Sequence, residues 1–312
     1  MKRMLLQRLA VLVPTLLLAS FIVFSLLQLV PGDPAVAIAG EQATTEQLAE
    51  IRARLGLDDS LLVQYWHWLT DALQGDLGSS LNTGEGVVEA IGRTLPTTLH
   101  IVVGGMIVAV LLGIPAGVAA GRRANTATDT AIASASSAGV AMPSFWLGLI
   151  LVSVFALRLG WLPATGFVGI TEDPVESIKH VILPAIAIGV VGAAEIARQL
   201  RAVMIEILAS DHVRTLRAKG LADRRVVWRH GLKNAAVPLL TIVGLQVNRF
   251  LGATVVIEAV FGISGLGTLV INATLKHDFP VVQGVVLVMV VIVVFTSFLV
   301  DISYRIFDPR IH

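Results

Sequence analysis

The sequence predicts an all-α membrane protein with six transmembrane helices and a helical extracytoplasmic segment after the first of them. The 312 residues are 55% hydrophobic and only 14% charged, whereas soluble domains average about 25% charged residues. Several apolar runs reach the roughly 20 residues that a spanning helix needs. The charged residues gather between these runs, basic in some intervals and acidic in others.

The first predicted span is Leu9–Val30, an uncharged run that follows Lys2, Arg3 and Arg8. Basic residues flank spans on the cytoplasmic side of a membrane. A cleaved signal peptide is the alternative, because an Ala-x-Ala pattern occurs at 37–39. The apolar run exceeds the about 7–15 residues of a signal peptide's apolar region. We therefore expect a retained N-terminal transmembrane helix over residues 1–30.

Residues 31–96 are predicted to form a helical segment outside the cytoplasm, because ten acidic residues and only three arginines lie there. Thr44 and Gln47 have the spacing of a capping box, and Gly56 can end the helix that follows. A second short helix is predicted over Leu61–Leu73. Its aromatic residues suit a membrane interface, or packing onto the helical bundle.

The main transmembrane domain is predicted over residues 97–305, followed by a cytoplasmic tail at 306–312. Met142-Pro143-Ser144 should kink or break one of its spans, because proline lacks a backbone donor. The outer turn between the last two spans is expected at 261–280. With six spans, both termini lie in the cytoplasm. The five spans of this domain are expected at 97–120, at 130–157, from 181 onward, at 235–257 and at 281–300.

The most basic interval, at about residues 205–235, lies between the fourth and fifth spans and is predicted to be cytoplasmic. Asp211 is placed to cap a short helix there, and Gly220 to supply its left-handed stop. Asp223 is placed to cap a second helix that runs toward Pro238. Apolar residues alternate with the charges, which favours a rigid projection that fits a partner's groove. The alternative is that the arginines only fix topology and contact anionic lipid.

Two motifs in this loop carry a resemblance to a known family: VRTLRAKGL at 213–221 and RHGLKNAAVP at 229–238. They are similar to the "EAA" loop of permease subunits of ABC importers, in the version of the dipeptide, oligopeptide and nickel permease family. Shorter matches occur in order along nearly the whole chain, such as LVPGDP at 29–34 and EAVF at 258–261. Leu216 departs from the motif, in which alanine is usual.

The resemblance implies the six-helix fold of type I importer permeases and a coupling helix that docks in a cleft of a cytoplasmic ATPase. It implies import of di- or oligopeptides across the bacterial cell membrane. The expected partners are a second related permease in a heterodimer, two cytoplasmic ABC ATPase subunits and an extracytoplasmic binding protein. Chelated nickel or another small solute is the alternative cargo. The loop residues concerned are Asp211, Val213, Arg214, Thr215, Arg217, Ala218, Lys219, Gly220 and Leu221.

No enzyme activity is predicted for this chain. The phosphate-loop motif G-x-x-x-x-G-K-[ST] does not occur, so we expect ATP and magnesium to bind partner subunits and no cofactor to bind here. The chain has no cysteine and its seven histidines are scattered, which gives no metal site. The near-zero net charge gives no sign of a nucleic-acid partner. A self-sufficient secondary transporter is the rival class, but we find no convincing inverted repeat.

Charged residues inside a membrane are costly, and they are candidates for a functional site by default. Arg249 lies about halfway along the fifth predicted span, beside Asn248, and Glu195 lies on the fourth. The candidate pathway residues are Asn248, Arg249 and Glu195, and we expect Arg249 to meet a peptide carboxylate. The alternative is an internal ion pair of Arg249 with Glu195. Glu195 and Arg198, at positions i and i+3, predict a local ion pair.

Overall fold

The computed structural model describes residues 2–28, 35–36 and 44–307, and every named element within these ranges is a helix. The described residues form two compact units, one within Met1–Pro96 and Ser264–Phe295 and the other within Thr97–Ile263 and Thr296–His312. The motif at 29–34, the Ala-x-Ala pattern at 37–39 and residues 308–312 of the predicted tail lie outside the described residues.

In the first unit, the two short helices predicted after the first span are confirmed. Helix α3 spans Thr45–Leu55 and α4 spans Leu61–Leu73. The capping box is present, because the Thr44 hydroxyl accepts from the Gln47 backbone N–H and the Gln47 side chain accepts from the Thr44 backbone N–H. Gly56 ends α3 in the left-handed conformation, with φ 63°. These local signals are therefore sufficient to set the ends of α3.

Helix α4 packs against α1, which spans Lys2–Gln28. The Tyr65 ring meets the Phe21 ring edge-on, with centroids 5.1 Å apart, and its hydroxyl lies 2.8 Å from the Ser20 hydroxyl. Trp66, the next residue, is 63% exposed. Packing onto the bundle thus accounts for part of the aromatic content of α4 and leaves Trp66 on the surface.

The first unit also contains α13, Leu266–Leu275, where the sequence predicted only an outer turn. Its apolar residues join a core cluster with the N-terminal turns of α5 and α14. This tertiary packing stabilises the helix, although the glycines in the segment had predicted a turn. The buried members of the cluster are Val87, Ile91, Leu266, Ala273, Val281 and Val285. Helix α14 spans Phe279–Phe307, so the tail predicted to begin at 306 begins within a helix.

A buried carboxylate fixes the start of α14. Asp278 is 4% exposed and accepts hydrogen bonds from the Ser80 hydroxyl and from the backbone N–H of Leu81. The Asn82 side-chain amide donates to the same carboxylate. The turn before α5 is therefore joined to the turn before α14, although the two segments lie far apart in the sequence.

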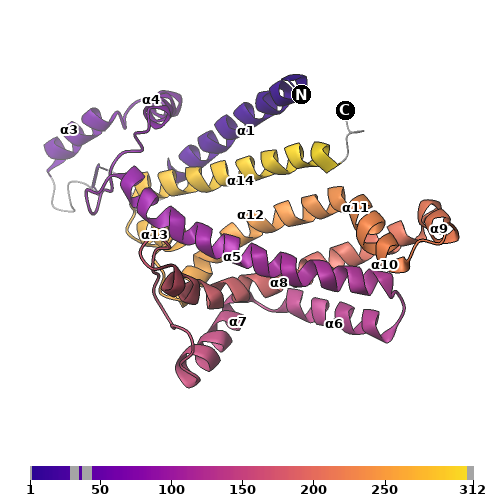
Figure 1. Cartoon of the computed structure of the whole chain (residues 1–312). Helices are drawn as coiled ribbons and strands as arrows, with labels where there is room; N and C mark the ends of the chain where they lie inside the picture. Colours follow the sequence, from indigo (N-terminus) through magenta and orange to yellow (C-terminus); the bar gives the residue numbers. More distant parts are fainter. Residues whose placement is uncertain (1, 29–34, 37–43, 308–312) are drawn as a thin grey trace. The chain divides into compact units, whose positions relative to one another are not determined.

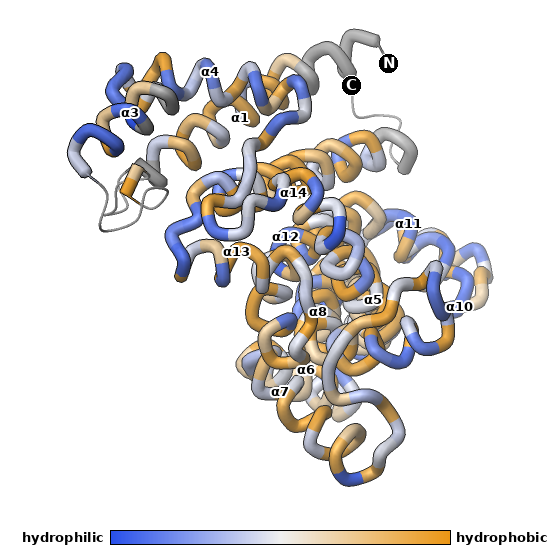
Figure 2. The backbone as a smooth tube through the Cα atoms, turned by 90° about the vertical axis from the view of Figure 1, so that its left-hand side faces the viewer, coloured by the Kyte–Doolittle hydropathy of each residue, from blue (hydrophilic) through white to orange (hydrophobic). Residues whose placement is uncertain are grey.

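The second unit is arranged around α8, Pro174–Ala209, against which α6, α7 and α12 pack (Figure 1). Helix α5 spans Val87–Arg122. It begins ten residues before the predicted domain boundary at 97, so the last part of the predicted extracytoplasmic segment is helix α5. Helix α12 spans Ala236–Val260, close to the prediction. In Figure 2 the hydrophobic colour dominates α5 and α14, and the hydrophilic colour dominates α10 and α11.

The predicted break at Met142-Pro143-Ser144 is confirmed. Helix α6 spans Ala127–Ala141, and α7 spans Ser144–Leu151 and continues into a π-helix, η1, at Val152–Arg158. The two halves are bent by 95°. Pro143 occupies the N-cap position of α7, where its missing donor costs nothing.

Four helices of the described residues are long and apolar enough to cross a membrane: α5, α8, α12 and α14. The bent pair makes a fifth span if its two halves are counted as one. Helix α1 adds a shorter apolar stretch, Ala10–Ser25. The structure thus supports a multi-helix membrane protein with four or five of the six predicted spans.

Glycines bring the backbones of α5 and α8 together. A Cβ atom added at Gly117 would lie 2.9 Å from both the Ala197 carbonyl oxygen and the Leu200 Cβ. Gly113 and Gly121, four residues to either side, face equally close contacts on α8. Small residues at four-residue spacing let membrane helices approach where apolar burial gives no driving force.

We predict that Gly117→Ala destabilises the protein by about 1–3 kcal/mol, because the added methyl overpacks the α5–α8 contact. Gly92→Ala is the matched control on the same helix, since nothing lies within 4 Å of its added Cβ. The control should be neutral or stabilising by up to about 1 kcal/mol, through helix propensity. Thermal unfolding of the two variants in detergent measures the difference, and equal stabilities would contradict the close contact.

Candidate functional site

The basic loop contains a short helix, α9, that spans Asp211–Ala218. Asp211 is not its N-cap, contrary to the sequence prediction. Ser210 occupies that position, and its hydroxyl donates to the Ile207 carbonyl instead of capping α9. The Asp211 carboxylate lies 3.0 Å from the Arg214 guanidinium. A negative charge in the first turn still interacts favourably with the helix dipole, so Asp211 stabilises the helix without capping it.

The C-terminal end of α9 is formed as the sequence predicted, with Gly220 as the left-handed residue that stops the helix. The N–H of Leu221 donates to the Leu216 carbonyl and the N–H of Gly220 donates to the Arg217 carbonyl. These two hydrogen bonds form a Schellman motif, which needs a left-handed residue. Gly220 has φ +79°, so glycine suits this position better than any residue with a side chain.

The second half of the loop is helical, as the sequence predicted, but its middle is a π-helix instead of an α-helix. It consists of α10 at Asp223–Arg225, a π-helix, η2, at Val226–Gly231, and α11 at Leu232–Asn234, before α12 begins. A π-helix widens the turn and is frequent at functional sites. Val226, Val227 and Gly231 are buried, so one side of η2 packs against the rest of the unit.

Asp223 does not cap the second helix either, because Ala222 occupies the N-cap position and two arginines bind the Asp223 carboxylate. Arg122, at the end of α5, lies 2.9 Å from one oxygen, and Arg217 of α9 lies 3.1 Å from the other. All three side chains are about half exposed. Asp223 therefore connects α9 to α5.

Apolar contacts seat the loop on the ends of α5 and α8. A buried cluster joins those two helices to η2 and the start of α12; its members are Val118, Leu200, Met204, Val227 and Ala235. Val213, on α9, is fully buried. We expected Val213 to belong to an apolar stripe that faces a partner, but it anchors α9 to its own chain. The exposed residues of α9 include Arg214, Thr215 and Ala218, and its C-cap residue Lys219 is also exposed.

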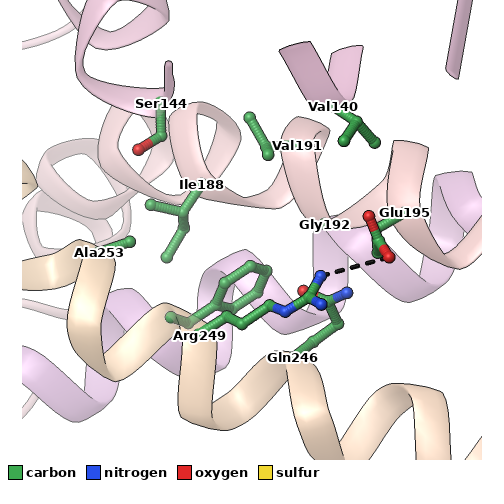
Figure 3. A pocket seen from close by; sticks show the side chains of 10 residues that line it. Val140, Ser144, Ile188, Val191, Gly192, Glu195, Gln246, Arg249 and Ala253 are labelled. Carbon is green, nitrogen blue, oxygen red and sulfur yellow. Dashed lines mark ion pairs between the residues drawn. The ribbon is translucent and has the colours of Figure 1, made fainter. Parts of the chain in front are cut away.

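A second candidate site is a cavity of about 180 Å³ between α6, α7, α8 and α12 (Figure 3). Its lining residues are Val140, Ser144, Ile188, Val191, Gly192, Glu195, Gln246, Arg249, Phe250 and Ala253. Most of these side chains are apolar, and the charged ones lie at one end of the group. Such a lining resembles that of small-molecule sites, although the volume is below their usual range of about 300–1,000 Å³.

The Glu195 carboxylate is 9% exposed and lies 3.3 Å from the Arg249 guanidinium, which is 57% exposed. It also accepts hydrogen bonds from Arg198 at 3.1 Å and from Gln199 at 2.6 Å. The predicted local pair of Glu195 with Arg198 is confirmed. Arg249 forms the internal ion pair that was the alternative to a free pathway arginine, so its charge is compensated in this conformation.

Asn248 does not share the cavity. It lies one turn after Gly244, on the face of α12 where a Cβ added at Gly244 would meet Val300 of α14 at 2.4 Å. Its Oδ1 atom is buried and has no hydrogen-bond partner. Gln246 lines the cavity and is 2% exposed; its helical spacing of three from Arg249 would have indicated it from the sequence.

Sequence reasoning also missed a buried ion pair between α6 and α8. Asp129 is 3% exposed and accepts two hydrogen bonds from Arg201, one of them 2.8 Å long. Thr126 caps α6 by accepting from the Asp129 backbone N–H. This capping pattern was readable in the sequence, but the partner 72 residues away was not. Among the described residues, no group of three or more potential ligands is placed to hold a metal ion.

Residues 113–312 match the family model described as "Binding-protein-dependent transport system inner membrane component", and residues 1–102 match its N-terminal companion. The chain therefore belongs to the family of binding-protein-dependent transport system inner membrane components. The family resemblance found in the sequence is confirmed. Such permeases are multi-pass, non-catalytic subunits, and the ATPase lies elsewhere.

Similar proteins cover the chain almost end to end. It is 38% identical over 326 residues to the dipeptide transport system permease protein DppB of Alkalihalophilus pseudofirmus, with 98% of each chain covered. It is 38% identical to the glutathione transport system permease protein GsiC of Salmonella choleraesuis, with 98% of this chain and 97% of that one covered. A solved inward-facing structure of the MetNI methionine ABC transporter shares the fold. Its TM-score is 0.57 at 19% identity, over 70% of this chain and 96% of that chain.

We predict that Asp223→Ala speeds backbone amide exchange in α9 several-fold, because Arg217 then loses its connection to α5. Arg224→Ala is the control, since the exposed Arg224 has no ion pair in the described structure. Hydrogen exchange measured by mass spectrometry on peptides that cover 211–218 compares the two variants. Equal exchange rates would show that Asp223 does not hold α9.

Proposed function

We propose that this chain is the permease subunit of an ATP-driven importer of small peptides. The observation that carries the proposal is similarity along the full length to permeases named for dipeptides, for di- and tripeptides and for glutathione. Glutathione is itself a tripeptide, so these relatives share one chemical class of cargo. Their identities to this chain are alike, at 38%, so the peptide length stays open.

The proposed topology has six spans, with both termini in the cytoplasm of a bacterial cell. Its members are α1, α5, the bent pair α6–α7 with η1, α8, α12 and α14. The distribution of charge supports it, because the acidic interval with α3 and α4 and the basic loop with α9 then lie on opposite sides. The acidic interval would meet the extracytoplasmic binding protein that delivers the peptide.

Helix α9 is the proposed coupling helix. It is short, ends at Gly220, contacts α8 and η2, buries Val213, and is connected to α5 by the Asp223 ion pairs. A cytoplasmic ATPase that holds its exposed side would therefore move the ends of α5 and α8 together with it. Two ATPase subunits, which bind ATP and magnesium, and a second related permease complete the proposed complex.

The cavity between α6, α7, α8 and α12 is the proposed point of contact with the cargo, and Arg249 is the residue that contacts the cargo. Breaking a buried ion pair by removing one partner is costly. Glu195 keeps Arg198 and Gln199 when Arg249 turns away, so Arg249 can bind a peptide carboxylate without leaving the buried Glu195 unpaired. Arginine binds carboxylates with two parallel hydrogen bonds. The proposal gives Asn248 no direct contact.

Family membership removes the alternative of a self-sufficient secondary transporter. Chelated nickel remains the alternative cargo, and no observation on the described residues favours it over peptides.

We predict that Gly220→Val uncouples ATP hydrolysis from peptide uptake, because a β-branched residue resists the left-handed conformation at this position. Gly220→Asn is the matched variant, since asparagine tolerates that conformation and no atom lies within 4 Å of the added Cβ. Uptake of a labelled dipeptide per ATP hydrolysed should fall in the valine variant and stay near the wild-type value in the asparagine variant. Normal coupling in Gly220→Val would remove Gly220 from the mechanism.

We predict that Arg249→Gln lowers peptide uptake at least about tenfold, the value of one charge-assisted hydrogen bond to the cargo, while the complex still assembles. Arg198→Gln is the control, because it removes a Glu195 partner and leaves Arg249 in place. Uptake into proteoliposomes is measured together with co-purification of the ATPase. An equal fall in both variants would mean that Arg249 acts only as a partner of Glu195.

A further inference from the structure

The segment that follows α9, from Asp223 to Asn234, has one buried and one exposed side. Hydrogen bonds in a π-helix join residues five apart, so residues at a spacing of four lie close to one line along it. Arg225, Arg229 and Lys233 have this spacing, and so do Arg224 and Trp228. All five residues are exposed, and we call them the basic face: Arg224, Arg225, Trp228, Arg229 and Lys233.

The charges of the basic face are not neutralised within the chain. Among the described residues, none of its four cations forms an ion pair or a side-chain hydrogen bond. The nearby acids are already occupied: Asp211 pairs with Arg214, and Asp223 binds Arg122 and Arg217. The basic face therefore presents four unpaired positive charges, in contrast to α9, whose arginines pair with these acids.

The basic face also includes an apolar ring at the end of a candidate span. Trp228 is 44% exposed. Helix α12 begins at Ala236, two residues after Asn234, and is apolar enough to cross a membrane. Tryptophan is enriched at the boundary between the lipid tails and the headgroups, and clusters of Lys and Arg next to a span attract anionic headgroups.

We propose that the basic face binds the headgroups of anionic phospholipids in the leaflet where the basic loop emerges. Four unpaired cations supply the charge complementarity, and the ring of Trp228 supplies the apolar contact. The two halves of the loop then have different partners. Helix α9 remains available to a protein partner, while the segment from α10 to α11 holds the N-terminal end of α12 at the membrane surface. The inference uses the membrane placement of the loop and is independent of the cargo.

The test measures how much phosphatidylglycerol the complete transporter complex retains. The complex is reconstituted in phosphatidylcholine bilayers that contain phosphatidylglycerol, without peptide or ATP, and is extracted in mild detergent. The double variant Arg224→Gln/Arg229→Gln is compared with Arg214→Gln/Lys219→Gln, which removes the same number of charges from α9 and its C-terminal cap. The first variant should lower the affinity for phosphatidylglycerol about thirtyfold, because each of two cations contributes about 1 kcal/mol. The second variant should retain the lipid like the wild type.

A second readout is the tryptophan fluorescence of Trp228. It is obtained as the difference between the wild type and the Trp228→Phe variant. Phosphatidylglycerol with brominated chains should quench this signal more strongly than brominated phosphatidylcholine does. Equal retention in both double variants, or equal quenching by the two lipids, would overturn the proposal. Loss of the ATPase from Arg224→Gln/Arg229→Gln at unchanged phosphatidylglycerol retention would also overturn it, because a protein would then cover the basic face. Peptide uptake is not part of either readout, so a wrong cargo assignment does not affect the result.

Discussion

The close approach of α5 to α8 is the constraint on which the second unit depends. Glycines at 113, 117 and 121 face backbone and Cβ atoms of α8 at distances that leave no room for a side chain. A glycine at 192, on α8, likewise makes room for the Phe250 ring of α12. Helices α6 and α7 also pack against α8. The position of α8 is therefore restricted by α5, α6, α7 and α12. The unit therefore has one central helix, and a displacement of that helix affects the cavity and the loop together.

That arrangement explains why the loop and the charged cavity belong to one mechanism in the proposed function. Helix α8 carries Glu195 near its middle, and its last turns contact α9 and η2. Val213 of α9 is buried, and the Asp223 ion pairs connect α9 to α5. In the proposed function, a partner that pulls on α9 acts on α8 and α5, and α8 carries the Glu195 carboxylate that pairs with Arg249 of α12.

The sequence predicted those features that depend on neighbouring residues. The capping box of Thr44, the left-handed stop at Gly220 and the break at Pro143 each follow from local backbone chemistry, and each is present. Features that depend on distant contacts were missed. Asp223 was read as a cap because Arg122, about a hundred residues away, cannot be placed from the sequence. Helix α13 and the π-helix η2 likewise form where tertiary packing outweighs local preference.

In the proposed function, α9 is the surface by which a separate ATPase drives this chain. The chain has no cysteine, so a single introduced cysteine reports one position. Thr215→Cys, on the exposed side of α9, should form a cross-link to the ATPase subunit in the assembled complex, and the yield should change when ATP binds. Leu73→Cys, at the 79% exposed end of α4, should form none. A cross-link from Leu73→Cys alone, or none from Thr215→Cys, would show that α9 is not the surface that meets the ATPase.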